Sequence, residues 1–118
     1  NMTESFQGKK EENVMLENKV TVGEGTVIKS GVKIIGPVII GKNCVIENDV
    51  IIEENTSIGD NSYLSCCTIS NSIIMSNCII KGKLDIKNSI IASNSKIIKE
   101  QNGNSKKFLL GEGTQISL

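Results

Sequence analysis

The sequence of 118 residues contains no histidine and no tryptophan, and its only aromatic side chains are Phe6, Tyr63 and Phe108. Three aromatic side chains are too few for the stacking platforms on which proteins bind single-stranded nucleic acid. Thirteen basic side chains balance thirteen acidic ones, so no overall field draws the chain to nucleic acid or to an anionic membrane. We therefore expect neither nucleic acid nor a membrane among its partners.

Long apolar segments are also missing. No run approaches the length of a transmembrane helix, and residues 1–13 are too polar and charged for a secretory signal peptide. These features predict a cytoplasmic protein. The chain begins with Asn1 rather than methionine, which leads us to expect a segment of a longer protein.

The four cysteines, Cys44, Cys66, Cys67 and Cys78, fit no common zinc-binding spacing. Reduced thiols are expected in a cytoplasmic chain. We predict that Cys44 and Cys78 are packing residues in one column with Ser62 between them, too far apart for a disulfide. Cys66 and Cys67 are predicted at a corner, as one packed thiol beside a partly exposed one.

Aliphatic side chains recur at every sixth position through the first half of the chain. They are Leu16, Val22, Ile28, Ile34, Ile40, Ile46, Ile52, Ile58 and Leu64. A second series, of small or β-branched residues, follows four positions later: Val20, Thr26, Val32, Val38, Cys44, Val50, Thr56, Ser62 and Thr68. The positions just before this second series are mostly typical of turns: Lys19, Gly25, Gly31, Pro37, Asn43, Asp49, Asn55 and Asn61.

A six-residue period fits one short strand followed by one corner. An amphipathic helix would repeat its apolar face after three and four residues, and a meander would turn after eight to twelve. Three such sides close a triangular coil of about eighteen residues, whose strands stack at the spacing of a parallel sheet. The predicted interior columns are Leu16, Ile34 and Ile52; Val22, Ile40 and Ile58; and Ile28, Ile46 and Leu64.

The phase of the repeat changes after Leu64. The next inward residues are predicted at Ile69, Ile74, Ile80, Ile86, Ile91 and Ile97, and three of the steps are five residues long. Two of the short steps end in Asn-Ser-Ile-Ile, at 71–74 and 88–91. We predict a linker at 1–13, a β-helix at 14–98, a loop at 99–107 and a final coil or C-terminal cap at 108–118.

The repeat resembles the hexapeptide-repeat family, in which an aliphatic residue is followed by Gly, Ala, Glu or Asp and, three residues further on, by a small residue. Segments 22–26, 40–44 and 58–62 match this pattern closely. The resemblance implies an all-β fold, a single-stranded left-handed parallel β-helix of about five to six coils. Physics alone would favour the right-handed crossover that parallel strands normally adopt.

A narrower resemblance is to the C-terminal domains of sugar-1-phosphate nucleotidyltransferases, closest to long-form glucose-1-phosphate thymidylyltransferases. Four runs carry it, Gly-Pro-Val-Ile-Ile-Gly at 36–41, Thr-Ser-Ile-Gly-Asp-Asn at 56–61, Asn-Ser-Ile-Ile-Met at 71–75 and Phe-Leu-Leu-Gly-Glu at 108–112. The resemblance spans residues 14–118 and departs from the family at Glu112, where Asp is usual. It implies that a catalytic domain with Mg²⁺ precedes residue 1 and that the parent protein makes a nucleotide sugar, dTDP-glucose being favoured.

The resemblance implies that the β-helix holds catalytic domains together as an oligomer and docks against its own catalytic domain. No catalytic residue of the family maps onto this sequence. We therefore assign no catalytic, cofactor-binding or metal-binding residue to this segment, and we expect it to be non-catalytic and to bind no cofactor.

Other functions of the same fold have sequence requirements of their own. A hexapeptide-repeat acyltransferase uses a histidine as general base, whose pKa suits proton removal near neutral pH. A γ-class carbonic anhydrase needs three histidines on zinc and is excluded by the sequence. The acyltransferase stays open as an alternative, as does a stand-alone scaffold in which Lys9–Lys10 and Lys106–Lys107 would form a small phosphate-binding patch.

Self-association is expected from isoleucines outside the inward columns: Ile35, Ile39, Ile51, Ile73, Ile79 and Ile90. Some of them must point to solvent, where they could form a partner interface. We expect a homo-oligomer, with a trimer of parallel axes favoured.

Overall fold

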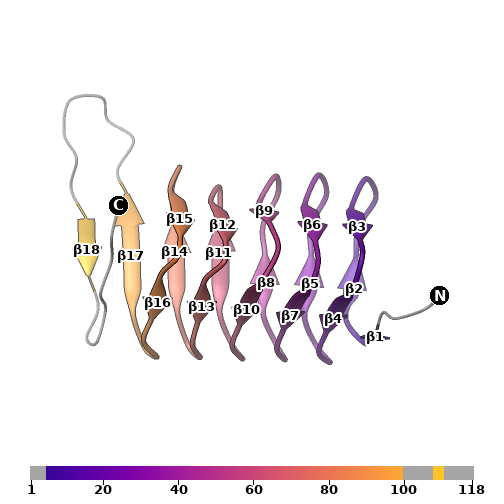
Figure 1. Ribbon diagram of the computed structural model, residues 1–118, viewed down its shortest axis with the longest axis horizontal. Helices are drawn as coiled ribbons and strands as arrows, with labels where there is room; N and C mark the ends of the chain where they lie inside the picture. The colour runs from indigo at the N-terminus through magenta and orange to yellow at the C-terminus, as the bar shows by residue number, and fades with distance from the viewer. Residues whose placement is uncertain (1–4, 100–107, 111–118) are drawn as a thin grey trace.

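The computed structural model describes residues 5–99 and the backbone of 108–110. Its strands wind around a single axis in a stack of successive coils (Figure 1). The strands lie in three sheets. Sheet A consists of β1 (Ser5–Phe6), β4 (Val20–Val22), β7 (Val38–Ile40), β10 (Thr56–Ile58), β13 (Ile73–Ile74) and β16 (Ile90–Ile91). Sheet B consists of β2 (Lys9–Lys10), β5 (Val27–Ile28), β8 (Val45–Ile46), β11 (Tyr63–Ser65), β14 (Ile79–Lys81), β17 (Lys96–Lys99) and β18 (Phe108–Leu110). Sheet C consists of β3 (Met15–Glu17), β6 (Lys33–Ile35), β9 (Ile51–Ile52), β12 (Thr68–Ser70) and β15 (Asp85–Lys87).

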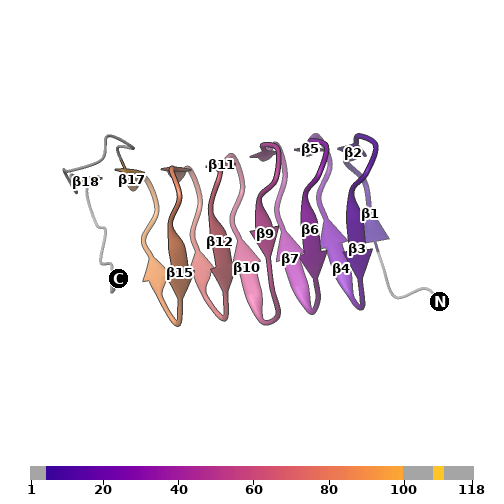
Figure 2. The same cartoon turned by 90° about the horizontal axis from the view of Figure 1, so that it is seen from above.

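Successive strands of the chain belong to successive sheets, so that one strand from each sheet makes one triangular coil. Figure 2 shows the coils stacked side by side along the axis. All strand pairs from β1 to β17 are parallel, because each strand pairs with the strand one coil earlier and one coil later. The all-β fold predicted from the sequence, a left-handed parallel β-helix, is confirmed.

Like aliphatic residues stack through the interior. Ile34 pairs with Ile52 in sheet C, and Ile40 pairs with Ile58 in sheet A. In sheet B, Ile46 pairs with Leu64. The predicted inward positions after Leu64 are also correct, since all of them are buried: Ile69, Ile74, Ile80, Ile86, Ile91 and Ile97. β-branched residues suit these short strands because they pack well on a pleated surface.

The corners of the coil need backbone with positive φ, which Gly, Asn and Asp adopt with the least strain. Asn43, Asp49, Asn55 and Asn61 have φ between 56° and 64°, as their positions in the repeat predict. The Gly36–Pro37 pair also forms a corner, through a cis peptide bond. One corner differs from the expectation, because Asn18, and not Lys19, carries the positive φ there.

The second series of small residues departs from the prediction at Thr68. Cys67 occupies the buried position with 1 % of its surface exposed, and Thr68 is only half-buried. The corner between β11 and β12 is one residue shorter than the six-residue step assumes, with Cys66 at φ 62° as its turn residue. The corners that lead into β13 and β16 are shortened in the same way, with Asn71 and Asn88 at positive φ.

Both expected boundaries of the β-helix also differ. β1 and β2 lie within the expected linker at 1–13, yet they pair in parallel with β4 and β5, so the coil begins before residue 14. At the other end β18 pairs antiparallel with β17, whereas a further coil would pair in parallel. Residue 99 of the expected loop still belongs to β17. The rest of that loop (100–107) and the remainder of the predicted final coil (111–118) lie outside the described residues.

In the part of the chain that the structure describes, no helix has the length and apolar character needed to cross a membrane.

Candidate interaction surface

Three of the four thiols are packed inside the coil. All four cysteines are free, and only Cys66 is exposed. Burial raises the pKa of Cys44 and Cys78, and it raises the pKa of Cys67 to about 12. Because the thiolate is the nucleophile, these three protonated thiols are unreactive near neutral pH. The prediction that Cys44 and Cys78 are packing residues, and that a packed and an exposed thiol are adjacent at a corner, is confirmed.

Hydroxyls and thiols form a buried polar column at the corner between sheets A and B. The column contains Thr26, Cys44, Ser62, Cys78 and Ser95. Thr26 Oγ1 donates to the carbonyl oxygen of Gly41 at 2.7 Å and accepts from the backbone N–H of Cys44 at 3.0 Å. The Cys44 and Cys78 thiols donate to the carbonyl oxygens of Gly59 and Ala92 at 3.1 and 3.2 Å. These bonds join each coil to the next, so the column has a structural role.

Titratable side chains on the surface form few close groups. Among the described residues, no three His, Cys, Asp or Glu side chains are placed to hold a metal ion. On sheet B the Tyr63 hydroxyl donates to Glu47 Oε2 at 3.0 Å, and Lys81 Nζ lies 5.4 Å from the centre of the Tyr63 ring. Partial burial and the bond to Glu47 raise the pKa of Tyr63. The phenol is therefore neutral and acts as a hydrogen-bond donor at neutral pH.

Sheet A presents an outward row without a charged side chain. In coil order the row is Thr21, Ile39, Ser57, Ile73 and Ile90. The three isoleucines are 58 %, 47 % and 62 % exposed. By contrast, the outward rows of the other sheets include Lys9 and Lys96 in sheet B and Lys33 and Asp85 in sheet C. We call this row the charge-free face, and the depletion of charge together with exposed apolar side chains is typical of interface cores.

The six isoleucines expected outside the inward columns thus divide into two groups. Ile39, Ile73 and Ile90 are exposed on the charge-free face. Ile35, Ile51 and Ile79 lie on the other two sheets and are less exposed, since each of them is half-buried.

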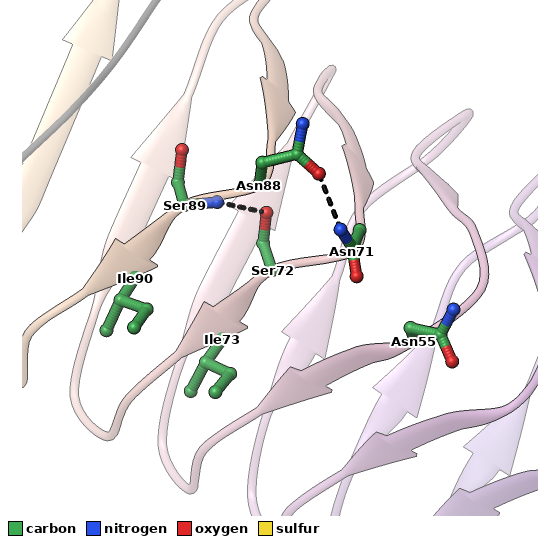
Figure 3. A pocket seen from close by; sticks show the side chains of 7 residues that line it. All are labelled: Asn55, Asn71, Ser72, Ile73, Asn88, Ser89 and Ile90. Carbon is green, nitrogen blue, oxygen red and sulfur yellow. Dashed lines mark hydrogen bonds between the residues drawn. The ribbon is translucent and has the colours of Figure 1, made fainter.

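A hollow of about 330 Å³ lies beside Ile73 and Ile90 (Figure 3). Its other walls come from the corner between sheets C and A and consist of Asn55, Asn71, Ser72, Asn88 and Ser89. The side-chain amide of Asn71 donates to Asn88 Oδ1. Ser72 Oγ accepts from the backbone N–H of Ser89 at 3.1 Å (Figure 3).

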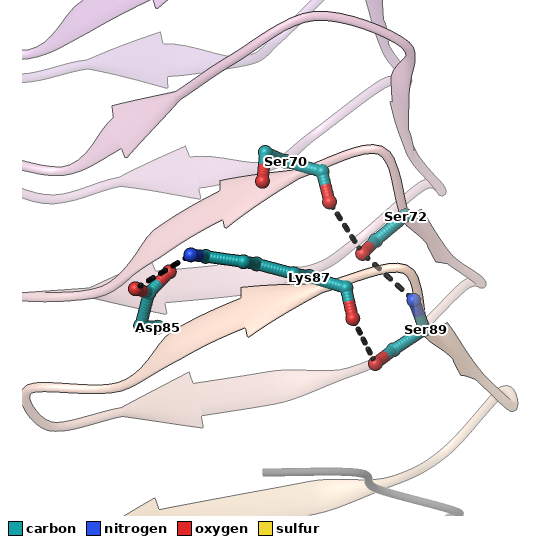
Figure 4. A network of polar contacts seen from close by, with 5 residues as sticks. All are labelled: Ser70, Ser72, Asp85, Lys87 and Ser89. Atoms are coloured by element: carbon teal, nitrogen blue, oxygen red, sulfur yellow. Dashed lines mark hydrogen bonds and ion pairs between the residues drawn. The ribbon is translucent and has the colours of Figure 1, made fainter.

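The remaining hydrogen bonds of this corner hold its serines inward. Ser72 Oγ donates to the carbonyl oxygen of Ser70, and Ser89 Oγ donates to that of Lys87, both at 2.8 Å (Figure 4). The ion pair between Lys87 and Asp85 in the same view spans 3.6 Å between exposed side chains, so it contributes little to stability. The polar atoms of this wall are therefore largely occupied by the chain itself.

The hollow coincides with the shortened corners. Before β10 the corner reads Glu53-Glu54-Asn55, whereas before β13 and β16 it reads Ser70-Asn71 and Lys87-Asn88. The hollow lies along the two shorter corners, and Asn55 from the longer corner before them also lines it. The sequence carried the signal for this site in the repeated Asn-Ser-Ile-Ile runs, but the repeat by itself did not reveal a hollow.

Coils of short parallel strands, asparagine corners and stacked aliphatic columns together define a hexapeptide-repeat β-helix. The family model of the GMPPB C-terminal domain matches residues 34–117. The chain belongs to this family, and its resemblance to the C-terminal hexapeptide-repeat domain of a nucleotidyltransferase is confirmed at that level.

Of two solved structures that are similar to this chain, only the first has a TM-score above 0.5. The chain is similar to a mutant of perosamine N-acetyltransferase from Caulobacter crescentus in complex with CoA and GDP-perosamine, with a TM-score of 0.59 and 13 % identity over 92 % of this chain and 57 % of that chain. The acetyltransferase domain of PglB from Neisseria gonorrhoeae gives a TM-score of 0.40 and 14 % identity over 87 % of this chain and 55 % of that chain. The chain thus spans little more than half the length of either protein. No match was found among curated proteins.

Proposed function

We propose that this chain is the C-terminal β-helix domain of a sugar-1-phosphate nucleotidyltransferase. Such an enzyme joins a nucleoside triphosphate to a sugar-1-phosphate and releases pyrophosphate. The observation that carries the proposal is the match of residues 34–117 to the GMPPB C-terminal domain family. The resemblance of the runs at 36–41, 56–61, 71–75 and 108–112 to long-form thymidylyltransferases supports dTDP-glucose as the product.

The domain acts through its shape in this proposal. It associates with further copies of itself, holds the catalytic domains in an oligomer in the cytoplasm and docks against its own catalytic domain. Support comes from the backbone hydrogen bonds and buried columns that join every coil to the next, since they make the domain a stiff spacer. The charge-free face supplies a surface suited to association. The Mg²⁺ and the catalytic residues belong to the preceding domain.

An acyltransferase is the second candidate, because the structure with a TM-score of 0.59 is an N-acetyltransferase. At 13 % identity this similarity concerns the fold alone. The reaction needs a general base, and the chain has no histidine. Burial keeps Cys67 protonated and raises the pKa of Cys44 and Cys78, so these thiols are poor substitutes.

The test uses the gene together with its upstream coding sequence. We expect the full protein to release pyrophosphate from dTTP and glucose-1-phosphate in the presence of Mg²⁺, and more slowly from other nucleoside triphosphates. We expect no turnover of acetyl-CoA by the 118-residue chain with nucleotide-linked amino sugars. An upstream sequence without a nucleotidyltransferase domain would contradict the proposal, as would acetyl-CoA turnover by this chain alone.

A further inference from the structure

We propose that the hollow beside Ile73 and Ile90 is a binding site for an uncharged sugar ring. This goes beyond the proposed function, because it gives the β-helix a ligand of its own and does not depend on the preceding domain. Four properties of the hollow point to this ligand: its size, the absence of charge from its lining, the free amide atoms of its asparagines and its apolar wall.

The size and the charge of the hollow limit the ligand. Its volume of about 330 Å³ lies at the lower end of the range for small-molecule pockets, about 300–1,000 Å³, so it suits a single ring rather than a nucleotide. All seven lining residues are uncharged. Lys87, which precedes Asn88 in the chain, is paired with Asp85. A phosphate or a carboxylate would therefore find no counter-ion among the lining residues.

The asparagines of the hollow offer donors and acceptors side by side. Asn71 Nδ2 donates to Asn88 Oδ1, which leaves, among the described residues, Asn71 Oδ1 as a free acceptor and Asn88 Nδ2 as a free donor (Figure 3). The side-chain amide of Asn55 forms no hydrogen bond with the described residues either. A hydroxyl both donates and accepts, so the hydroxyls of one sugar ring match this mixture. A ligand with acceptors alone would satisfy only the donors.

Ile73 and Ile90 form the apolar wall of the hollow. They are 47 % and 62 % exposed, and they pair with each other in the adjacent strands β13 and β16. A pyranose ring has C–H groups on its faces and hydroxyls around its rim. One face packs on the isoleucines, where contact removes apolar surface from water, while the rim reaches the amides of the corner. A sugar ring thus uses both walls of the hollow.

The positive φ of the corners explains why asparagine occurs there, but it does not explain the composition of the hollow. Asn61 and Asn77 have φ of 59° and 61° at the corner between sheets A and B, and neither lines the hollow. What distinguishes the hollow is the pairing of two asparagine amides beside two exposed isoleucines. The other corner therefore supplies a matched control.

The first experiment titrates the isotope-labelled 118-residue chain with methyl β-D-glucopyranoside and follows its amide resonances by NMR. We expect saturable shifts of the Asn71 and Asn88 side-chain amides. The dissociation constant should be on the order of 1 mM, as expected for about 13 non-hydrogen atoms at ordinary ligand efficiency. The protein concentration is kept low, because a partner on the charge-free face would compete for Ile73 and Ile90. Cyclohexanol, which has one hydroxyl, should bind about tenfold more weakly.

The second experiment repeats the titration with variants. Asn88→Gly should raise the dissociation constant about fivefold, because one hydrogen bond is lost while glycine keeps the positive φ. Asn77→Gly is the matched control and should bind like the unsubstituted chain. Ile90→Ala should also weaken binding, whereas Ile39→Ala truncates a similarly exposed isoleucine outside the hollow and should not. The amide spectrum shows whether each variant is folded.

Absence of saturable shifts at about ten times the expected dissociation constant would overturn the proposal. Cyclohexanol binding as tightly as the glucoside would also overturn it, since the hollow would then be an apolar patch only, and so would equal weakening by Asn77→Gly and Asn88→Gly. dTDP-glucose distinguishes a free sugar from the sugar unit of a nucleotide sugar. Binding no tighter than that of the glucoside supports a site for the ring alone, and binding about tenfold tighter would show that the phosphates are recognised and would overturn a site for an uncharged ligand.

Discussion

Replacing Thr26 by valine tests whether the buried polar column holds the coils together. Thr26 is fully buried, and valine has nearly its shape, so the substitution removes the hydroxyl without opening a cavity. Two hydrogen bonds are lost: the one that Oγ1 donates to the Gly41 carbonyl and the one that it accepts from the Cys44 N–H.

The cost is dominated by the Cys44 N–H, which is left buried without an acceptor. An orphaned buried donor costs about 1–3 kcal/mol, and the lost bond to Gly41 adds about 1 kcal/mol. The more apolar valine returns about 1 kcal/mol through burial of its extra methyl group. We therefore expect Thr26→Val to lower the free energy of unfolding by about 1–3 kcal/mol, which for a domain of this size lowers Tm by roughly 4–12 °C.

The assay is urea denaturation followed by far-UV circular dichroism, with Thr56→Val as the matched control. Thr56 is also buried at a corner, but its hydroxyl contacts only the Glu54 carbonyl, at 3.5 Å, among the hydrogen bonds that the structure shows for it. Its column already contains Val20 and Val38, so the control should change stability by less than about 0.5 kcal/mol. Equal losses in both variants, or no loss for Thr26→Val, would refute the role assigned to the hydroxyl.

Three further predictions concern the thiols. Cys66→Asn should raise the urea midpoint, equivalent to about 0.5–1 kcal/mol, because asparagine tolerates the φ of 62° better than cysteine does; a lower midpoint would count against corner strain. Ellman's reagent at neutral pH should modify one thiol of the folded chain, Cys66, and all four in denaturant; fast reaction of a second thiol in the folded chain would contradict the burial. Because the pKa of Cys67 is raised to about 12, the folded chain keeps a proton that the unfolded chain releases above the ordinary thiol pKa. This stabilisation is complete below about pH 8.5 and declines by up to about 1.4 kcal/mol per pH unit until pH 12, so Cys67→Val should show a shallower alkaline loss of stability than the unsubstituted chain, and equal slopes would exclude the effect.

The interior columns could be predicted from the sequence because a six-residue period has few structural solutions. Each aliphatic residue from Val22 to Leu64 occupies the predicted inward position, and the fold class follows from that. The inward residues after Leu64 could also be predicted despite the shortened steps, since only one choice of isoleucines places an apolar residue in each strand of the coil.

The features that the sequence did not reveal lie at corners and ends. The six-residue step predicts Thr68 in the interior because the step shortens by one residue just before it, and a cysteine at positive φ gives no turn signal comparable with asparagine. The first coil does not show the aliphatic repeat, because Phe6 and Lys10 stand where later coils have Val22 and Ile28. Lys10 Nζ lies 5.6 Å from the centre of the Phe6 ring, so the terminal coil uses a cation–π contact at positions that are aliphatic elsewhere.

The candidate surface could be anticipated only as a set of outward isoleucines. Which of them share one face depends on how many residues each corner contains. The hollow beside Ile73 and Ile90 also lies where the corner length changes, because the corner before each of their strands is one residue shorter. The sequence repeat predicts which residues point inward, but it does not predict the three-dimensional shape of a corner.

The variable corners have an evolutionary consequence. In sheet A, pairing joins Ile40 to Ile58, Ile58 to Ile74 and Ile74 to Ile91, although the coils between these residues differ in length. In an antiparallel hairpin, a one-residue deletion within a strand would turn every following side chain to the opposite side. In this chain, a corner that is one residue shorter leaves the interior isoleucines stacked in the same column. Related proteins with this fold can therefore gain or lose single residues at the corners, which changes their surface while the buried core stays the same.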